Sequence, residues 1–153
     1  MAVEGTGSGT SLNTFGAVLR FAIDLEERVA HFYAEAAALA QSPQVSDLLL
    51  GMSSARERRS QEVARIRREN VAEMILEPVS GMDGAAYMRD LSPAGHVSDS
   101  DRLRMATLLE GDAERFYLDA SNRLSIAEVN RLLKRLAREC GQARARAEAL
   151  AQG

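Results

Sequence analysis

The sequence has few of the residues on which disulfide-linked, sheet-rich and membrane-spanning proteins depend. It contains no tryptophan, one cysteine, three prolines and two histidines in 153 residues. A single cysteine excludes a disulfide within the chain and is typical of a reducing compartment. The scarcity of β-branched runs leaves little room for a sheet. No apolar run approaches the length of a membrane span, so we expect a soluble, cytoplasmic protein with no membrane partner.

The chain also has no strong excess of charge of one sign. Its formal net charge is -3, and arginines alternate with glutamates at helical spacing, as in the stretch RERRSQEVARIRRE. Such a mixture is typical of a solvent-exposed helix face that carries ion pairs. We therefore expect no nucleic-acid partner.

Alanine, leucine, arginine and glutamate, which favour helices, are abundant. Their periodic spacing predicts an all-α domain over residues 12–151. The predicted segments are a flexible lead-in (1–11), helices over about 12–41, 43–76, 99–123 and 126–151, and a crossover (77–98) with one short helix near 84–91. Ser42 and Pro43 suit the start of the second helix, and capping boxes at 98–101 and 125–128 suit the third and fourth.

The first and third predicted helices repeat each other. The stretches AIDLEERVAHFY (22–33) and ATLLEGDAERFY (106–117) align without a gap. Each helix has an inward stripe with a single carboxylate: Leu19, Ala22, Glu26, Val29, Tyr33, Ala36 and Ala40 in the first, and Leu103, Ala106, Glu110, Ala113, Tyr117, Ala120 and Leu124 in the third. A carboxylate in an apolar stripe is costly unless it is paired. Two of them in register indicate a duplication.

The second and fourth predicted helices complete the repeat. They present Leu50, Ser53, Glu57, Ser60 and Ala64 in the second, and Leu133, Leu136, Cys140, Ala143 and Ala147 in the fourth. Glu57 is thus a third inward carboxylate, and Cys140 takes its place in the other half. Two helical hairpins joined by a long crossover predict a ferritin-like four-helix bundle.

These residues resemble the rubrerythrin-like branch of the ferritin-like superfamily over roughly 12–151. In that family, one glutamate from each of the first and third helices, with a Glu-x-x-His motif from each of the others, holds two iron ions. The resemblance implies that Glu26, Glu57 and Glu110 occupy three of the ligand positions.

Other positions of the family pattern have changed. Ser60 and Ala143 stand where the two histidines would be, and Cys140 stands in place of the fourth glutamate. Tyr33 and Tyr117 remain, and the resemblance implies that their hydroxyl groups hydrogen-bond the ligands. Helical side chains lean toward the N-terminus, so both rings are expected to point back at the carboxylates.

Three interpretations follow from this reduced ligand set. The one we adopt is a degenerate site, in which the glutamates are remnants, no cofactor is bound and the protein is not an enzyme. Arg28 or Arg56, which flank the stripes, would then be the nearest cations. The alternative is an oxidoreductase or iron-handling protein that holds iron or zinc through the three glutamates, completed by Cys140 or water. A third is a small molecule bound in the vacated core.

Two further expectations concern partners and the remaining reactive residues. A second apolar strip on the first helix, suited to a homodimer, contains Phe15, Val18, Ala22, Leu25 and Phe32. Cys140 on an apolar stripe is expected to act as a small hydrophobe. His31 and His96 lack the helical partner that a metal site needs. The sequence thus predicts a non-catalytic, dimeric binding or partner protein.

Overall fold

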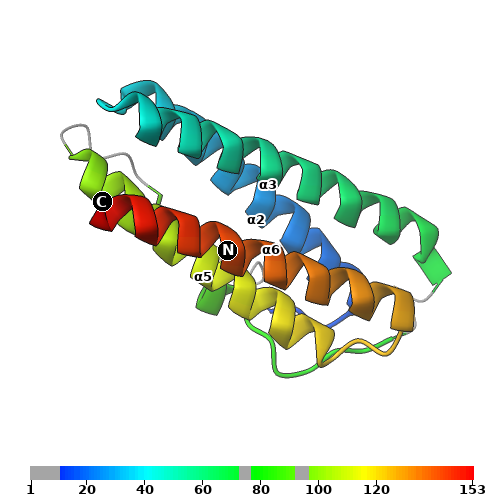
Figure 1. Cartoon of the computed structure of the whole chain (residues 1–153). Helices are drawn as coiled ribbons and strands as arrows, with labels where there is room; N and C mark the ends of the chain where they lie inside the picture. Colours follow the sequence, from blue (N-terminus) through cyan, green and yellow to red (C-terminus); the bar gives the residue numbers. More distant parts are fainter. Residues whose placement is uncertain (1–10, 73–76, 92–96) are drawn as a thin grey trace, which may run out of the picture.

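The computed structural model describes residues 11–72, 77–91 and 97–153. Over these residues the chain forms four long α-helices and one short 3₁₀ helix, and no strand (Figure 1). The long helices are α2 (Phe15–Leu39), α3 (Pro43–Glu69), α5 (Asp99–Ser121) and α6 (Ala127–Gln152), and the 3₁₀ helix is η1 (Gly84–Tyr87). The predicted all-α four-helix bundle is confirmed.

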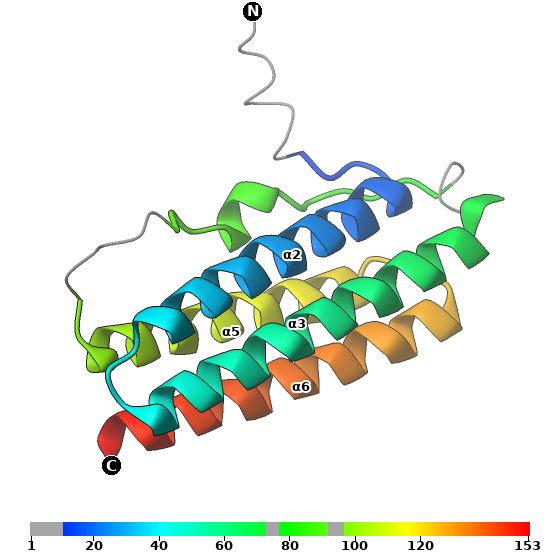
Figure 2. The same cartoon turned by 90° about the horizontal axis from the view of Figure 1, so that it is seen from above.

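The helices pack as two hairpins, α2 with α3 and α5 with α6, and packing within each hairpin is more extensive than packing between them. Figure 2 shows α3 beside α6, with the crossover running over α2. The predicted lead-in (apart from residue 11), the end of the second helix near Leu76, and His96 lie outside the described residues. No helix among the described residues is long and apolar enough to cross a membrane.

Helix starts follow the sequence in two cases and depart from it in one. Ser42 caps α3 by accepting from the Gln44 amide, with Pro43 in the first turn. A capping box joins Ser98 and Asp101 at the start of α5. The expected capping box at 125–128 is wrong, because α6 begins at Ala127 and its N-cap residue makes no side-chain hydrogen bond.

The chain before α2 is extended rather than helical. The predicted start near residue 12 is therefore too early, and the reason is pairing with the crossover. The Leu12 amide donates to Met82 O at 3.3 Å, and the Val79 amide donates to Asn13 O at 2.9 Å. Isolated bridges join 11 to 83 and 14 to 78. This pairing holds the crossover against the start of the bundle.

The second apolar strip of α2 is covered by the chain itself. Phe15, Val18 and Leu25 are buried, and they share one hydrophobic cluster with Met82 and Tyr87 of the crossover. The strip offered as the reason for a homodimer is therefore not a free surface.

Candidate functional site

The two repeated glutamates lie where the sequence placed them. Glu26 of α2 and Glu110 of α5 are completely buried. The predicted stripe of α5 is buried along its length, and so is that of α2 up to Ala36; the stripe of α6, including Cys140, is buried as well. The periodic apolar spacing on either side of each carboxylate is what turns these faces inward. The bundle therefore has a layer of acidic side chains at its centre.

Helix α3 presents a different face from the one predicted. Glu57 is exposed, which contradicts its assignment as an inward ligand. The buried face instead contains Arg56 and Arg59, of which 0% and 2% of the side chain is exposed. Their spacing of three residues places both guanidinium groups on one side of α3. The cations that the two buried glutamates need therefore come from α3.

Arg56 bridges the two halves of the bundle. Its Nη1 donates to Glu26 Oε1 at 3.0 Å, while its Nε and Nη2 donate to Glu110 Oε2 at 2.9 and 2.8 Å. Its Nη2 also donates to the backbone oxygen of Leu109 at 3.1 Å. One guanidinium group thus binds a carboxylate from each hairpin.

Arg59 repeats the bridge in the same layer. Its Nε donates to Glu26 Oε2 at 3.0 Å, and its Nη2 donates to Glu110 Oε1 at 3.4 Å. Its Nη1 lies 3.8 Å from Glu139 Oε1, whose carboxylate also accepts a hydrogen bond from Arg135 at the surface. Two buried arginines and two buried glutamates therefore balance each other in formal charge, and we call these four residues the charge quartet.

The tyrosines close the charge quartet crosswise. The Tyr33 hydroxyl of α2 donates to Glu110 Oε2 at 2.6 Å, and the Tyr117 hydroxyl of α5 donates to Glu26 Oε2. Each tyrosine of one repeat thus binds the glutamate of the other, so the two contacts are equivalent under the pseudo-symmetry of the sequence. Both rings point back at the carboxylates, in the direction expected from helical geometry.

The quartet shifts the pKa of the groups around it. Burial alone would lower the pKa of Arg56, but the charges of Glu110 and Glu26 outweigh burial and raise that pKa well above its usual value. The same balance, with Glu26 as the main carboxylate, raises the pKa of Arg59. Burial, reinforced by the neighbouring carboxylates, raises the pKa of both Tyr33 and Tyr117. Both arginines are therefore charged, and both tyrosines keep their protons.

Cys140 lies beside this layer without joining it by a hydrogen bond. Burial raises the pKa of its thiol well above the ordinary range, and the opposing pull of Arg59 and Arg56 is too weak to reverse that. A thiol must lose its proton to act as a nucleophile or a zinc ligand. Cys140 is therefore a packed, protonated side chain.

The residues of the layer do not fit a di-iron centre or a single iron or zinc ion. All four carboxylate oxygens of Glu26 and Glu110 already accept hydrogen bonds from guanidinium groups, two of them also from tyrosines. Two fixed positive charges would repel an added cation at close range. Among the described residues, no group of three or more His, Cys, Asp or Glu side chains is placed to hold a metal ion.

Ser60, which was predicted beside the carboxylates, and His31, which was expected outside the site, both lie away from the layer. Ser60 is buried, but its hydroxyl donates to Glu27 at 3.3 Å rather than to the carboxylates of the quartet. His31 is exposed and pairs with Glu35 of its own helix at 3.1 Å. Neither takes part in the site.

Sequence reasoning missed Arg59 and weighed Arg56 only as a neighbour of the stripe. The signal that finds them is the apolar pattern of α3 itself. Leu49, Met52, Val63 and Ile66 are spaced as one face of a helix, and that face contains positions 56 and 59. The predicted stripe through Leu50, Glu57 and Ala64 is shifted by one residue from this buried face.

Comparison with known proteins adds no relative: no family model, curated protein or solved structure matches this chain. The functional argument therefore depends on the geometry of the site.

Proposed function

We propose that this chain is a ferritin-like bundle of the rubrerythrin-like branch in which two arginines have replaced the metal centre. In this proposal it is a non-catalytic protein that acts by binding a partner. One observation carries the proposal: Arg56 and Arg59 both bridge Glu26 and Glu110. The positive charge that such a layer requires is thus supplied by the chain itself.

The repeat supports the ancestry. Two hairpins joined by a long crossover each contribute a buried glutamate and a tyrosine, and the tyrosines bind crosswise. An unpaired buried carboxylate would cost several kcal/mol, so a bundle that lost its metal would need another cation at this depth. Arg56 and Arg59 meet that need because the guanidinium group stays charged when buried and binds carboxylates through several donors.

The same layer argues against catalysis. Every charged group in it is paired, both arginines keep their charge, and the thiol beside it keeps its proton. A layer of this kind holds helices in place, and function then belongs to the surface. We propose that the protein acts there, as a homodimer or on another protein.

Elemental analysis tests the proposal. Purified protein, incubated anaerobically with Fe(II) or aerobically with Zn(II) and then desalted, is expected to retain far less than one ion per chain. The Glu57→Ala variant is the matched control and should behave identically, because Glu57 is exposed. Stoichiometric metal that is lost in the isosteric Glu26→Gln/Glu110→Gln variant would overturn the proposal.

A further inference from the structure

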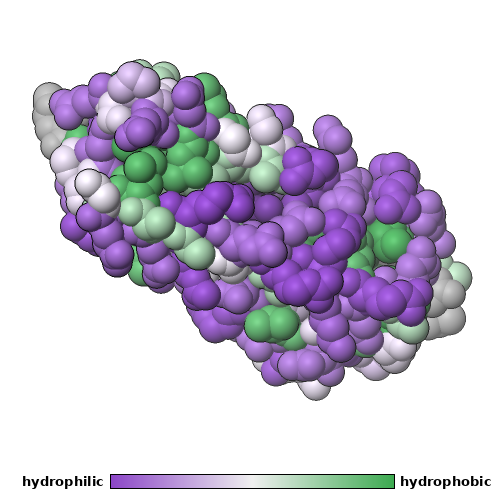
Figure 3. Space-filling model, viewed as in Figure 1, coloured by the Kyte–Doolittle hydropathy of each residue, from purple (hydrophilic) through white to green (hydrophobic). Residues whose placement is uncertain are grey.

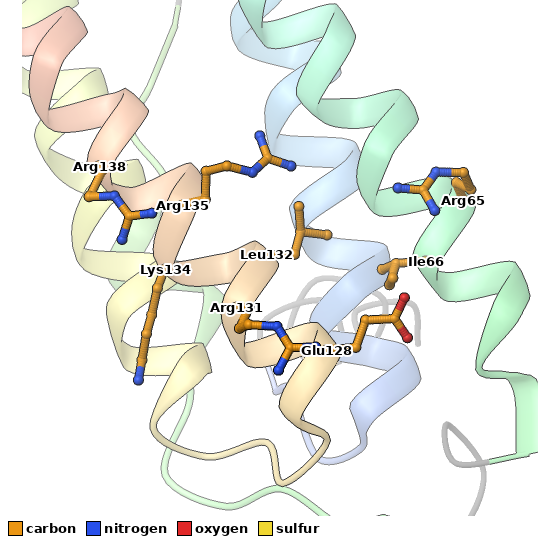
Figure 4. A pocket seen from close by; sticks show the side chains of 8 residues that line it. All are labelled: Arg65, Ile66, Glu128, Arg131, Leu132, Lys134, Arg135 and Arg138. Atoms are coloured by element: carbon orange, nitrogen blue, oxygen red, sulfur yellow. The ribbon is translucent and has the colours of Figure 1, made fainter.

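The surface between α3 and α6 carries a hollow with an unusual charge. Its volume is about 450 Å³, and it lies between the C-terminal half of α3 and the N-terminal half of α6 (Figure 4). Five cationic side chains and one carboxylate line it; the cations are Arg65, Arg131, Lys134, Arg135 and Arg138. We call this hollow the basic groove. It is a concentration of positive charge on a chain whose net charge is -3.

Three of the cations are free to bind an anion. Arg135 is held by Glu62 at 2.7 Å and Glu139 at 2.9 Å, and Arg65 pairs with a carboxylate of its own helix. The other three lining cations are exposed, and within the described part of the chain no ion pair engages them; they are Arg131, Lys134 and Arg138. Among the described residues, an incoming acidic group therefore displaces no ion pair at these positions.

The spacing of the free cations favours an extended ligand. They rise along α6 in steps of about 4.5 and 6 Å and span about 10 Å in all. Figure 4 shows that Arg131, Lys134 and Arg138 do not converge on one point, so they do not form a pocket for a single small anion. An extended polypeptide rises about 3.3 Å per residue, so a segment of about three residues spans the row, and the long arginine and lysine side chains can adjust to its spacing.

The lining favours a protein segment over a nucleic acid. None of the described residues that line the groove is aromatic, so these residues offer no surface on which bases would stack. Glu128 interrupts the cations, and a polypeptide can place a neutral residue there, whereas a phosphodiester chain carries charge at every unit. Ile66 and Leu132 lie between the two helices at the floor of the groove. The rest of the α3–α6 face is largely hydrophilic in its middle part (Figure 3).

We propose that the basic groove binds an extended acidic segment of a partner protein. The inference rests on the proposed function, since it names the surface and the kind of partner through which the bundle acts. Metal analysis tests the charge quartet and peptide binding tests the groove, so a failure of one is distinguishable from a failure of the other.

Fluorescence anisotropy with a fluorescein-labelled oligoglutamate peptide tests the proposal. The wild-type chain is expected to bind the peptide at low ionic strength, and affinity should fall as salt rises because exposed charges are screened. The Arg131→Gln/Lys134→Gln/Arg138→Gln variant should bind at least about tenfold more weakly. The control variant Arg20→Gln/Arg28→Gln/Arg104→Gln loses the same three charges from exposed positions on α2 and α5 and should bind as the wild type does.

Three outcomes would overturn the proposal. The first is that the peptide does not bind at low ionic strength. The second is that the groove variant and the control variant lose the same amount of peptide affinity. The third is that the groove binds a labelled oligothymidylate more tightly than the peptide. The last result would assign the groove to nucleic acid. Circular dichroism of both variants establishes that they fold, since all six substituted side chains are exposed.

Discussion

At the scale of single residues, the centre of the bundle is organised by charge balance. Arg56 and Arg59 each bind Glu26 and Glu110, so each ion has two counterions within hydrogen-bonding range. Replacing such a network by apolar residues is often neutral, whereas removing one member leaves an uncompensated buried charge. The energetic signature of the quartet is therefore coupling between its members rather than a large contribution from each.

A double-mutant cycle measures this coupling. Arg56→Met should destabilise the fold by about 3–5 kcal/mol, because the buried Glu110 carboxylate then keeps only two partners. These are Arg59 Nη2, at 3.4 Å, and the Tyr33 hydroxyl. Adding Glu110→Gln should recover part of the loss, since the unpaired charge is removed. Urea denaturation gives the free energies of unfolding. Arg58→Met on the exposed face of α3 is the control and should change stability by less than about 0.5 kcal/mol; strictly additive effects in the cycle would contradict the network.

The tyrosines give a pH-dependent prediction. Burial and the nearby carboxylates raise the pKa of Tyr33 and Tyr117 well above 10.0, and burial and a hydrogen bond to Asp119 raise the pKa of Tyr87 to about 12. A raised folded-state pKa stabilises the fold fully below the unfolded-state value, and that stability is lost as pH rises through the folded-state value. Stability should therefore fall from about pH 10 upward.

Tyrosinate absorbance checks this prediction directly, because the chain has three tyrosines and no tryptophan. In the folded protein, little tyrosinate should form at pH 10.0, the ordinary value for the side chain. In urea, all three should titrate near that value. A native protein in which two tyrosines ionise near pH 10 would show that their hydroxyl groups are not held in the core.

At the scale of the helices, the two expected capping boxes differ in structure and should differ in energy. The Ser98 hydroxyl accepts from the Asp101 amide at 3.1 Å, whereas Ser125 uses only its backbone amide, which donates to Glu77 at 2.9 Å. Ser98→Ala should therefore lower the free energy of unfolding by about 1 kcal/mol. Ser125→Ala is the matched comparison and should be nearly neutral in thermal denaturation. Equal losses of stability in the two variants would show that Ser125 caps α6 after all, which would contradict the structure.

The helices and three of the four inward faces were predictable from the sequence, because apolar spacing and caps act locally. Glu26 and Glu110 were found because each is the single carboxylate in a repeated stripe. The face of α3 was not found, although Leu49, Met52, Val63 and Ile66 mark it, because arginine is rarely buried and a carboxylate was expected on the inward side. The carboxylates that offset the cost of burying these arginines are Glu26 on α2 and Glu110 on α5, which are far from α3 in the sequence.

At the scale of the whole molecule, the charge quartet adds directional bonds between two hairpins that also share one hydrophobic cluster. Packing is concentrated within α2–α3 and within α5–α6. Across the hairpins run the bonds of Arg56 and Arg59 to Glu110 and the crossed bonds of Tyr33 and Tyr117. Polar contacts are directional, so they fix how one hairpin is placed on the other more strictly than alanine-rich packing does. The layer is therefore expected to set the alignment of the bundle.

The most direct test of the account is nuclear magnetic resonance of the arginine side chains in ¹⁵N-labelled protein. The Nε protons of Arg56 and Arg59 both donate to buried carboxylates. We predict two Nε–H signals, assigned by Arg56→Lys and Arg59→Lys, that exchange slowly with water and do not move when Zn(II) or a chelator is added. Rapid exchange of both, or a shift of both on metal addition, would contradict the claim that arginines have taken the place of the metal.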